Sequence, residues 1–587
     1  MDELLELLED IKPTVDFRTC TGLIDDGYLD SFDILSIVSE LNDAFGIEIS
    51  PVDIIPENFN SAQALWDMSF LSMKFLLFLA VAVAGYYVIP RQLQWVWLLI
   101  FSYIFYLASG PAAAVFILTT TVTTFLGGLC LEHTDRALKR ALRPDDPLRP
   151  LSTDEKKALK ERFKQRKKWI AALVLLINFG ILAALKYRNF AADNMNLLFG
   201  THFSPAKLLL PLGISFYTFQ SMGYLIDVYR GKYAPDRNPF RFALFVSFFP
   251  QILQGPIGRY DRLASQLYGQ KRFSLTRIER GLQLMLWGYF KKIVIADRAA
   301  VVVSEVFGNY QSYHGILVIA GVLCYSLQLY GDFSGGMDVV MGAAECFGIS
   351  LDANFKRPYF ARSISDFWHR WHITLGTWMK DYVFYPFSLS KGMNKLGKYC
   401  KIHFGKHVSR VLPVCIANLL VFFLVGVWHG PAWKFIVYGL YNGIIIAAGN
   451  LLAPIYTQMA RKLHIPAESS PWTAVRILRT FLLVNISWYF DMAESLGAAL
   501  AMMKNTVAGF TLSALTDGSL LRLGLDLKDC WALALSCVVL FTVSLLQENH
   551  VSMRDALAAK PLAARWCVYL MLLFSIPLLG QITMTGG

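Results

Sequence analysis

The pattern of apolar and polar positions changes near residue 70. Before that point, residues 2–11 place Leu and Ile at helical spacing, and a second helix is predicted over residues 31–45 with Gly46 as its C-terminal cap. An acidic loop, residues 22–30, separates the two helices. Residues 1–68 are therefore predicted to form a small helical bundle, close to the lower size limit for independent folding.

Beyond residue 68 the chain alternates long apolar runs with short polar loops, which predicts an all-α membrane domain over residues 69–587. About eleven of these runs are expected to span the membrane, and the shorter ones are expected to be re-entrant or interfacial helices. The candidate runs are 71–89, 93–109, 111–130, 169–186, 207–226, 241–254, 282–304, 314–330, 336–349, 410–428, 434–453, 473–491, 530–546 and 563–580.

Composition supports a polytopic membrane protein, because 55% of the 587 residues are hydrophobic and only 17% are charged. Charge divides the chain: residues 1–68 hold sixteen Asp or Glu and two basic residues, a net charge of −14, whereas the whole chain carries +11. The Lys and Arg residues lie in loops between apolar runs, which indicates contact with anionic membrane lipid and no nucleic-acid partner. The nine cysteines show no CxxC spacing, so neither disulfides nor a metal site is expected. The N-terminal segment does not have the pattern of a signal peptide.

Ser31 occupies the start of the second predicted helix, in the segment Asp-Asp-Gly-Tyr-Leu-Asp-Ser-Phe of residues 25–32. A hydroxyl at that point can carry a phosphodiester, because free backbone N–H groups and the helix dipole favour an anion there. A simple N-terminal cap is the alternative interpretation of a serine before an apolar helix. Together with Gly-Ile-Glu-Ile-Ser-Pro at 46–51, the segment resembles acyl carrier proteins, most closely the D-alanyl carrier protein. The resemblance implies 4'-phosphopantetheine on Ser31, with Asp30 beside it.

Two histidines lie in or beside apolar segments, where ionisable residues are costly and usually functional. His429 lies in Val-Trp-His-Gly-Pro-Ala-Trp, residues 427–433, and His372 in Phe-Trp-His-Arg-Trp-His-Ile-Thr-Leu, residues 367–375. A neutral imidazole is a suitable general base for a hydroxyl acceptor, although a lone buried His is often only a hydrogen-bonded core residue. No GxSxG elbow is present, so direct transfer from a thioester to a hydroxyl is the simplest mechanism.

These motifs resemble the membrane-bound O-acyltransferase family, in particular its branch of alginate O-acetylation and D-alanyl transfer proteins. Further stretches that support the resemblance are residues 211–220, 227–231, 249–251, 255–257, 330–336 and 364–382. The resemblance implies that His429 is the catalytic histidine, that His372 is a second important one, and that both face a tunnel. Trp428 and Trp371 are candidates to line that tunnel. One departure is Asn442, because relatives often carry a His in the helix after the Trp-His-Gly motif.

Three aspartates near predicted helix ends are more simply explained as structural groups. Asp332, Asp366 and Asp381 are expected to cap helices or to pair with Arg362, Arg370 or Lys380. Asp366 is also a candidate to orient His369 or Arg370.

The expected function is transfer of an acyl group, best assigned as D-alanyl, from the chain's own carrier to a hydroxyl of an extracytoplasmic polymer or relay. The expected partners are a cytosolic carrier-loading ligase, a phosphopantetheinyl transferase, and an acceptor that is a teichoic acid, a polysaccharide or a relay protein. Two alternatives stay open: an O-acetyltransferase with a separate donor and an N-terminal docking module, or a transporter or scaffold with structural histidines.

The predicted location is the bacterial cytoplasmic membrane, with a conflict about sidedness. Residues 131–168 contain thirteen Lys or Arg and are expected in the cytoplasm. If all three earlier runs span, the carrier lies outside, whereas carrier loading needs cytosolic enzymes. A cytoplasmic carrier is favoured, with the short run 93–109 failing to span.

Overall fold

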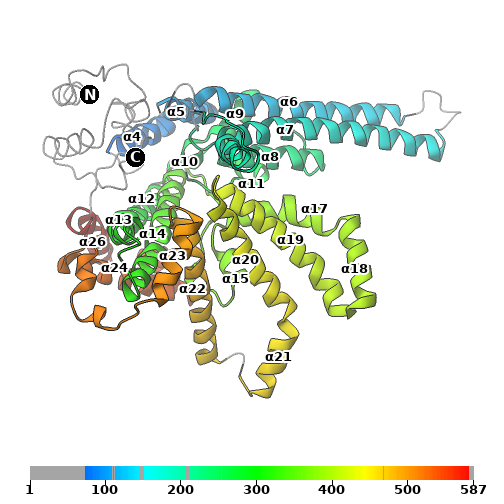
Figure 1. The fold of residues 1–587 in the computed structure, drawn as a ribbon. Coiled ribbons are helices and arrows are strands. Elements are labelled where there is room, and N and C mark those ends of the chain that lie inside the picture. Colours follow the sequence, from blue (N-terminus) through cyan, green and yellow to red (C-terminus); the bar gives the residue numbers. More distant parts are fainter. Residues whose placement is uncertain are drawn as a thin grey trace. The chain divides into compact units, whose positions relative to one another are not determined.

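The computed structural model describes most of the membrane domain predicted from the sequence, and its described residues contain helices and no strand (Figure 1). The predicted carrier bundle, including Asp30 and Ser31, lies outside the described residues. The described residues are 73–108, 110, 113–143, 151–206, 211–252, 254–466 and 469–580.

The chain divides into two compact units. One unit contains the described residues up to Gly85, then Ser274–Cys346, and the described residues from Gly497 onward; the other contains Tyr86–Phe273 and Phe347–Leu496. The second unit holds both histidines of interest and is called the histidine unit below, whereas the first is called the flanking unit.

The histidine unit is built from long helices joined to a run of short ones. Its elements are the 3₁₀ helix η3 (Arg91–Leu93), α5 (Gln94–Ala108), α6 (Ala114–Ala141), α7 (Thr153–Phe199), α8 (Ile214–Tyr229), α9 (Pro239–Ser247), α10 (Phe249–Ile252), α11 (Tyr260–Tyr268), the 3₁₀ helix η6 (Pro358–Phe360), α15 (Ile364–Arg370), α16 (Ile373–Met379), the π-helix η7 (Lys380–Phe384), α17 (Tyr385–Ser388), α18 (Lys391–His403), α19 (Gly405–His429), α20 (Trp433–Leu451), α21 (Ala453–Lys462) and α22 (Ser470–Met492).

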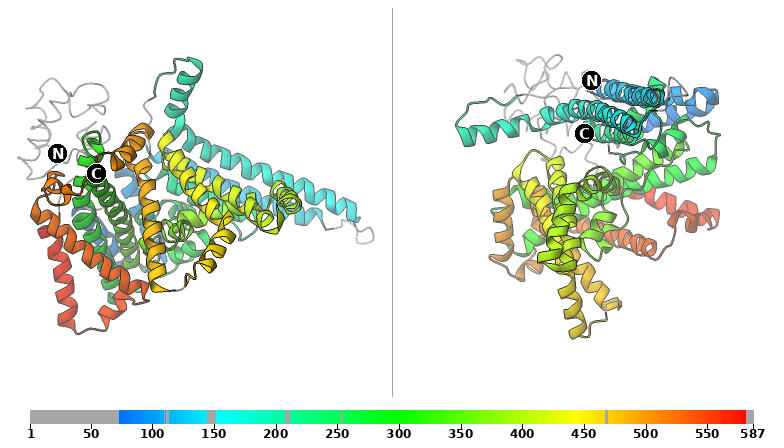
Figure 2. Two further views of the ribbon diagram at one scale, coloured as in Figure 1. Left: turned by 60° about the horizontal axis from the view of Figure 1, so that its bottom comes forward. Right: turned by 90° about the vertical axis from the view of Figure 1, so that its right-hand side faces the viewer.

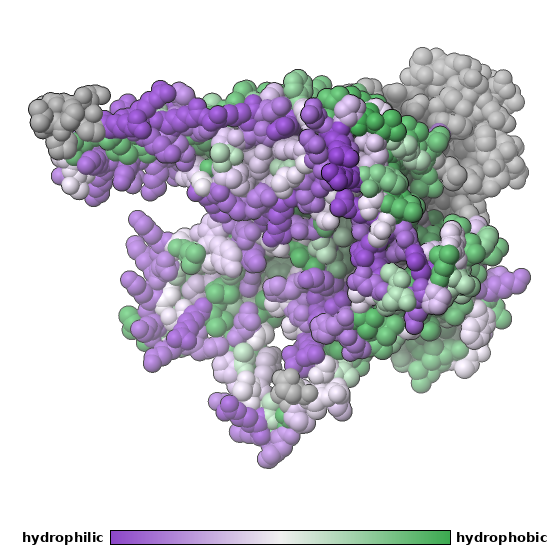
Figure 3. All heavy atoms as spheres, turned by 180° about the vertical axis from the view of Figure 1, so that it is seen from behind, coloured by the Kyte–Doolittle hydropathy of each residue, from purple (hydrophilic) through white to green (hydrophobic). Residues whose placement is uncertain are grey.

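The helices α6 and α7 lie side by side as a long antiparallel hairpin (Figures 1 and 2). A capping box starts α7, because the Ser152 hydroxyl accepts from the Glu155 N–H at 3.2 Å and the Glu155 carboxylate accepts from the Ser152 N–H at 2.8 Å. Buried Asn178 joins the pair by donating to the Thr123 hydroxyl at 3.0 Å. The outer part of the hairpin carries the basic segment predicted from the sequence and presents a hydrophilic surface (Figure 3).

Close backbone contact joins α19 to α20, the two helices on either side of the Trp-His-Gly motif. A Cβ atom on Gly439 would lie 2.1 Å from the Phe422 carbonyl oxygen, and one on Gly426 would lie 2.4 Å from the Phe435 carbonyl oxygen. These glycines therefore let the two helices approach each other more closely than side chains would permit. On its other side α20 packs against α22, which brings the end of α22 into the same part of the unit.

The flanking unit is organised around α14. Its described elements are α4 (Met73–Val88, which continues into the histidine unit), α12 (Leu275–Tyr289), the π-helix η5 (Phe290–Ala296), α13 (Asp297–Gly308), α14 (Ile316–Cys346), α23 (Leu496–Val507, which begins in the histidine unit), the 3₁₀ helices η8 (Ser513–Leu515) and η9 (Ser519–Arg522), α24 (Leu527–Glu548), α25 (Met553–Ala558) and α26 (Leu562–Leu579).

Two facing pairs of glycines allow α12 to lie directly on α14. A Cβ atom on Gly281 would lie 2.6 Å from the Gly342 carbonyl oxygen, and one on Gly335 would lie 2.7 Å from the Gly288 carbonyl oxygen. Small residues at these positions are typical of helix contacts inside membranes, where backbones approach closely to gain van der Waals contact.

The described residues contain fewer candidate spanning helices than the sequence predicted. Among the described residues, six helices are long and apolar enough to cross a membrane, or seven if the bent pair α20 and α21 is one span. The runs 314–330 and 336–349 were expected as two spans, but they form the single helix α14. The glycines between them continue the helix and allow neighbouring backbone to pack closely against it. The run 282–304 is divided by a π-helix. The run 93–109 forms the 15-residue helix α5, about 22 Å long and shorter than a hydrocarbon core of about 30 Å.

Crowding at the α12–α14 contact makes a testable prediction. The change Gly335→Ala should lower the melting temperature of the detergent-solubilised protein, because overpacking costs about 1–3 kcal/mol. The matched control is Gly180→Ala in α7, where the added Cβ meets nothing within 4 Å and helix propensity changes in the same way. Equal melting temperatures for the two variants would contradict the close contact.

Candidate functional site

His429 is the last residue of α19, and a lysine on another helix holds that helix end. The Lys186 ammonium group, on α7, donates to the carbonyl oxygen of Trp428 and, at 3.4 Å, to that of His429. The neighbouring Tyr187 hydroxyl donates to the carbonyl oxygen of Val427. The last carbonyls of an α-helix have no partner within the helix, so these three bonds satisfy the end of α19 and fix the backbone of His429.

A second lysine performs the same task at the end of α22. The Lys434 ammonium group, on α20, donates to the carbonyl oxygens of Asp491 at 3.1 Å and Ala493 at 2.6 Å. The Asp491 carboxylate, whose side chain is 8% exposed, then lies 3.5 Å from Nδ1 of His429. The C-terminal ends of α19 and α22 thus bring the His429 imidazole and the Asp491 carboxylate close together.

His372 precedes α16 in a left-handed conformation, with φ 45° and ψ 53°. This conformation is uncommon for a residue other than glycine and is maintained by its surroundings. The surroundings are Asn354, whose backbone oxygen accepts from the Ile373 N–H at 3.0 Å and whose Oδ1 accepts from the Thr374 N–H at 3.0 Å. Oδ1 also lies 3.2 Å from Nδ1 of His372.

These bonds determine the tautomer of His372. A backbone N–H can only donate, so the Asn354 atom that faces Thr374 is the amide oxygen, which can only accept. Nδ1 of the neutral His372 therefore carries the proton, and Nε2 carries the lone pair. The side chain is 4% exposed, so the ring is held in one orientation within the protein.

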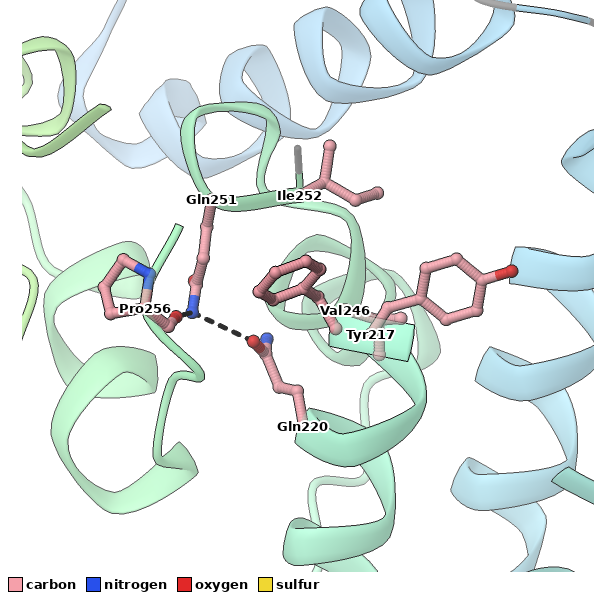
Figure 4. A pocket seen from close by; sticks show the side chains of 7 residues that line it. Tyr217, Gln220, Val246, Gln251, Ile252 and Pro256 are labelled. Atoms are coloured by element: carbon pink, nitrogen blue, oxygen red, sulfur yellow. Dashed lines mark hydrogen bonds between the residues drawn. The ribbon is translucent and has the colours of Figure 1, made fainter. Parts of the chain in front are cut away.

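A buried polar network continues from Thr374 to two glutamines, Gln251 and Gln220, and Figure 4 shows the part around these glutamines. The Thr374 hydroxyl accepts from the Ile257 N–H at 3.1 Å and donates to Asn354. One residue before Ile257, the carbonyl oxygen of Pro256 accepts from the Gln251 amide, which also donates to Gln220 Oε1 at 3.0 Å. The network therefore joins several of the motifs recognised in the sequence.

A small cavity of about 10 Å³ lies beside these glutamines, enough for about one water molecule (Figure 4). Within the described chain, Oε1 of Gln251 is buried without a hydrogen-bond partner, which is the kind of group that a buried water satisfies. The cavity is lined by Phe216, Tyr217, Gln220, Val246, Gln251, Ile252 and Pro256.

Aromatic rings enclose the two histidines. The Trp428 ring lies 5.5 Å from the His372 ring and 5.1 Å from the His429 ring, measured between centroids, and the Tyr438 ring lies 4.9 Å from that of His429. Trp428 Nε1 and the Tyr438 hydroxyl are buried with no hydrogen-bond partner among the described residues. Buried polar groups are normally paired, so two such donors near an imidazole are candidates to bind an oxygen atom of a substrate.

Among the other site residues predicted from the sequence, Trp371 and Asn442 are buried, and Asp366 is partly exposed. Trp371 is 4% exposed and stacks on Phe367 at 5.4 Å between ring centroids. Asn442 is 1% exposed, and its Oδ1 accepts from Trp368 Nε1 at 3.2 Å. The Asp366 carboxylate pairs with Arg370 at 2.9 Å.

For the remaining two aspartates, the expected partners were wrong. Asp332 lies 2.9 Å from Lys292, and Asp381 lies 2.7 Å from Arg259. Both partners are distant in sequence, whereas the prediction considered only basic residues close to the motifs. In the described part of the chain, no group of three or more His, Cys, Asp or Glu side chains is arranged to hold a metal ion.

Sequence reasoning did not select Asp491, Lys186, Lys434 or Asn354. For Asp491 and Lys186 a signal existed, since each is an ionisable residue at the end of an apolar run, the criterion that selected the histidines. Asn354 had no comparable signal, because a polar amide in a loop is common. Its structural role comes from four hydrogen-bond contacts with residues that only the fold brings near it.

Comparisons with known proteins agree on one family. Residues 235–400 match the model of the membrane-bound O-acyltransferase family. A probable alginate O-acetylase of Azotobacter vinelandii is 32% identical over 62% of this chain and 68% of its own. A peptidoglycan O-acetyltransferase of Helicobacter pylori is 35% identical over 57% of this chain and 64% of its own. A teichoic acid D-alanyltransferase of Bacillus subtilis is 29% identical over 49% of this chain and 70% of its own. The chain thus spans about two thirds of the length of these relatives.

The contact between Lys186 of α7 and the end of α19 leads to a testable prediction. Lys186→Met should lower the stability of the solubilised protein by about 1–3 kcal/mol, because buried carbonyl groups lose their donor. The control is Lys164→Met on the same helix, where the lysine is 69% exposed and pairs only with Glu161 at 3.4 Å. Thermal melts of both variants measure the difference, and a Lys186 variant as stable as the control would disprove the capping role.

Proposed function

The chain belongs to the membrane-bound O-acyltransferase family, and on that premise we propose that it passes an acyl group from a thioester donor to a hydroxyl acceptor. The observation that carries the proposal is that His429 and His372 both lie against the Trp428 ring. Its relatives include alginate and peptidoglycan O-acetylating proteins and a teichoic acid D-alanyltransferase. We propose an acceptor of the same class, a cell-wall or secreted polymer or a relay that serves it.

Each group near His429 has a chemical task in this proposal. The imidazole takes the proton of the acceptor hydroxyl, because a neutral imidazole has a lone pair that can accept it. The Trp428 N–H and the Tyr438 O–H are available to donate to the acyl oxygen as negative charge develops on it. His372 presents the Nε2 lone pair as a second acceptor, because Asn354 holds its Nδ1 proton.

The donor that we propose is the chain's own N-terminal segment, residues 1–68, with 4'-phosphopantetheine on Ser31. Support comes from the Asp30-Ser31 motif and the net charge of −14, since carriers are acidic around this serine. When bound, the group supplies the acyl cargo as a thioester. The protein would act in the bacterial cytoplasmic membrane with the carrier on the cytoplasmic side, where a ligase and a phosphopantetheinyl transferase load it.

The carrier motif favours D-alanine as the cargo, whereas the comparisons also favour an acetyl group. The O-acetylating relatives are 32% and 35% identical to this chain, and the D-alanyltransferase is 29% identical. A polysaccharide O-acetyltransferase with a separate donor, in which residues 1–68 serve as a docking module, is therefore the second candidate.

Mutation of the histidine tests the reaction class. His429→Ala should lower the rate of acyl transfer by at least about 10²-fold, because general base catalysis is lost. The control is His133→Ala, since His133 is exposed on α6 and far from the motif in sequence. A His429 variant that folds normally and transfers acyl groups at the rate of the control would refute the proposal.

Mass spectrometry tests the donor. The proteolytic peptide that contains Ser31, from protein purified from its native host, should carry a phosphopantetheine arm, and the adduct on the arm identifies the acyl group. Ser31→Ala should abolish transfer, whereas Ser36→Ala in the same segment should not. An unmodified Ser31 in active protein would favour the docking module and a separate donor.

A further inference from the structure

The two histidines differ in the group that faces Nδ1. For His372 the group is the Asn354 amide oxygen, at 3.2 Å, and for His429 it is the Asp491 carboxylate, at 3.5 Å. An amide oxygen orients a ring and leaves it neutral, whereas a carboxylate also stabilises the positive charge that the ring acquires on taking a proton. The two rings are therefore suited to unequal tasks.

We infer that Asp491 is the positioning residue for His429 and that its charge makes His429, and not His372, the base of the reaction. The inference rests on the proposed function. In the step, the acceptor hydroxyl gives its proton to Nε2 of His429 while its oxygen forms a bond to the thioester carbon. The carbon–sulfur bond then breaks, the sulfur leaves with the electron pair, and it takes the proton from Nε2. The Asp491 carboxylate stays ionised throughout.

The charges around His429 require such a partner. The Lys186 ammonium group binds the carbonyl oxygen of His429, so a cation lies near the imidazole, whereas Lys434 binds the backbone of Asp491. The Lys186 charge disfavours a protonated ring, and the Asp491 carboxylate is the anion that opposes it. The other ionisable groups around this pair are the Tyr438 hydroxyl and His372, which are neutral near neutral pH, and the Glu494 carboxylate, which interacts with Lys434.

The distance between the Asp491 carboxylate and Nδ1 of His429 is consistent with a catalytic pair that has no substrate bound beside it. A separation of 3.5 Å is within ion-pair range and longer than a good hydrogen bond. Catalytic hydrogen bonds are often long before substrate binds and shorten in the reactive complex. Lys434 fixes the backbone of Asp491, so a small rotation of the carboxylate is enough to close the gap.

The decisive experiment compares two buried aspartates. Asp491→Asn keeps the shape of the side chain and removes its charge, and it should lower kcat by about tenfold or more with KM unchanged. The matched control is Asp227→Asn, because the Asp227 side chain is 7% exposed, as Asp491 is at 8%, and its ion pair is with Lys232 and not with a histidine. Asp491→Glu, which keeps the charge, should recover part of the lost rate.

A second readout does not depend on turnover. Carbethoxylation by diethyl pyrocarbonate at alkaline pH, where the imidazole is neutral in every variant, measures the nucleophilicity of His429 by peptide mass spectrometry. The modification should be several-fold slower in Asp491→Asn than in Asp227→Asn, because the Nδ1 proton loses its anionic partner. The His429 side chain is 24% exposed, so the reagent can reach it.

The outcomes separate this inference from the proposed function. The turnover of the Asp227→Asn control tests acyl transfer itself, and the ratio between the two Asn variants tests the role of Asp491. Equal kcat values for the two, a loss confined to KM, or unchanged reactivity of His429 would overturn the inference while acyl transfer stands.

Discussion

The site depends on one constraint, which is that the free carbonyl groups at the ends of α19 and α22 must be hydrogen-bonded inside a membrane domain. Water is scarce there, and an unsatisfied backbone group costs several kcal/mol. Lys186 and Lys434 satisfy these ends, and each lysine is costly in such surroundings unless its donors are used. The last residue of α19 is His429, and Asp491 lies at the end of α22. The same bonds that complete the two helices therefore set the position of the imidazole and of its carboxylate.

A different device holds His372, which lies outside regular helix. Its left-handed backbone is a local cost of order 1–3 kcal/mol, and Asn354 offsets it with bonds to three consecutive residues, 372–374. Thr374 extends the support to Ile257 and from there toward the buried glutamines. The ring is thus oriented by groups that are themselves fixed, which is the condition for a site that needs little rearrangement when a substrate binds.

The helical class and the multi-pass membrane character predicted from the sequence are confirmed, and the roles of the two histidines, which a local signal selected, stay predictions. Hydrophobic runs indicate buried helices, and a histidine in such a run is conspicuous. The number of spans was not predictable in the same way, since glycines such as Gly331 and Gly335 suggest a break between two helices. In the structure they continue α14, where Gly335 allows α12 to approach and Gly331 allows η5 to approach. Asp491 was missed because its partner, His429, is 62 positions earlier in the chain and is brought near it by helix packing.

The polar surroundings of His429 favour direct transfer over a covalent intermediate. A protein nucleophile would need a hydrogen bond to the base that activates it. In the described part of the chain, the side chain within ion-pair range of the His429 imidazole is the Asp491 carboxylate, and the rings beside that imidazole are those of Trp428, Phe435 and Tyr438. No serine or cysteine is hydrogen-bonded to this imidazole among those residues. Since Asp491 faces Nδ1, the atom left for chemistry in the proposed reaction is Nε2, and the hydroxyl that it would activate is that of the acceptor itself.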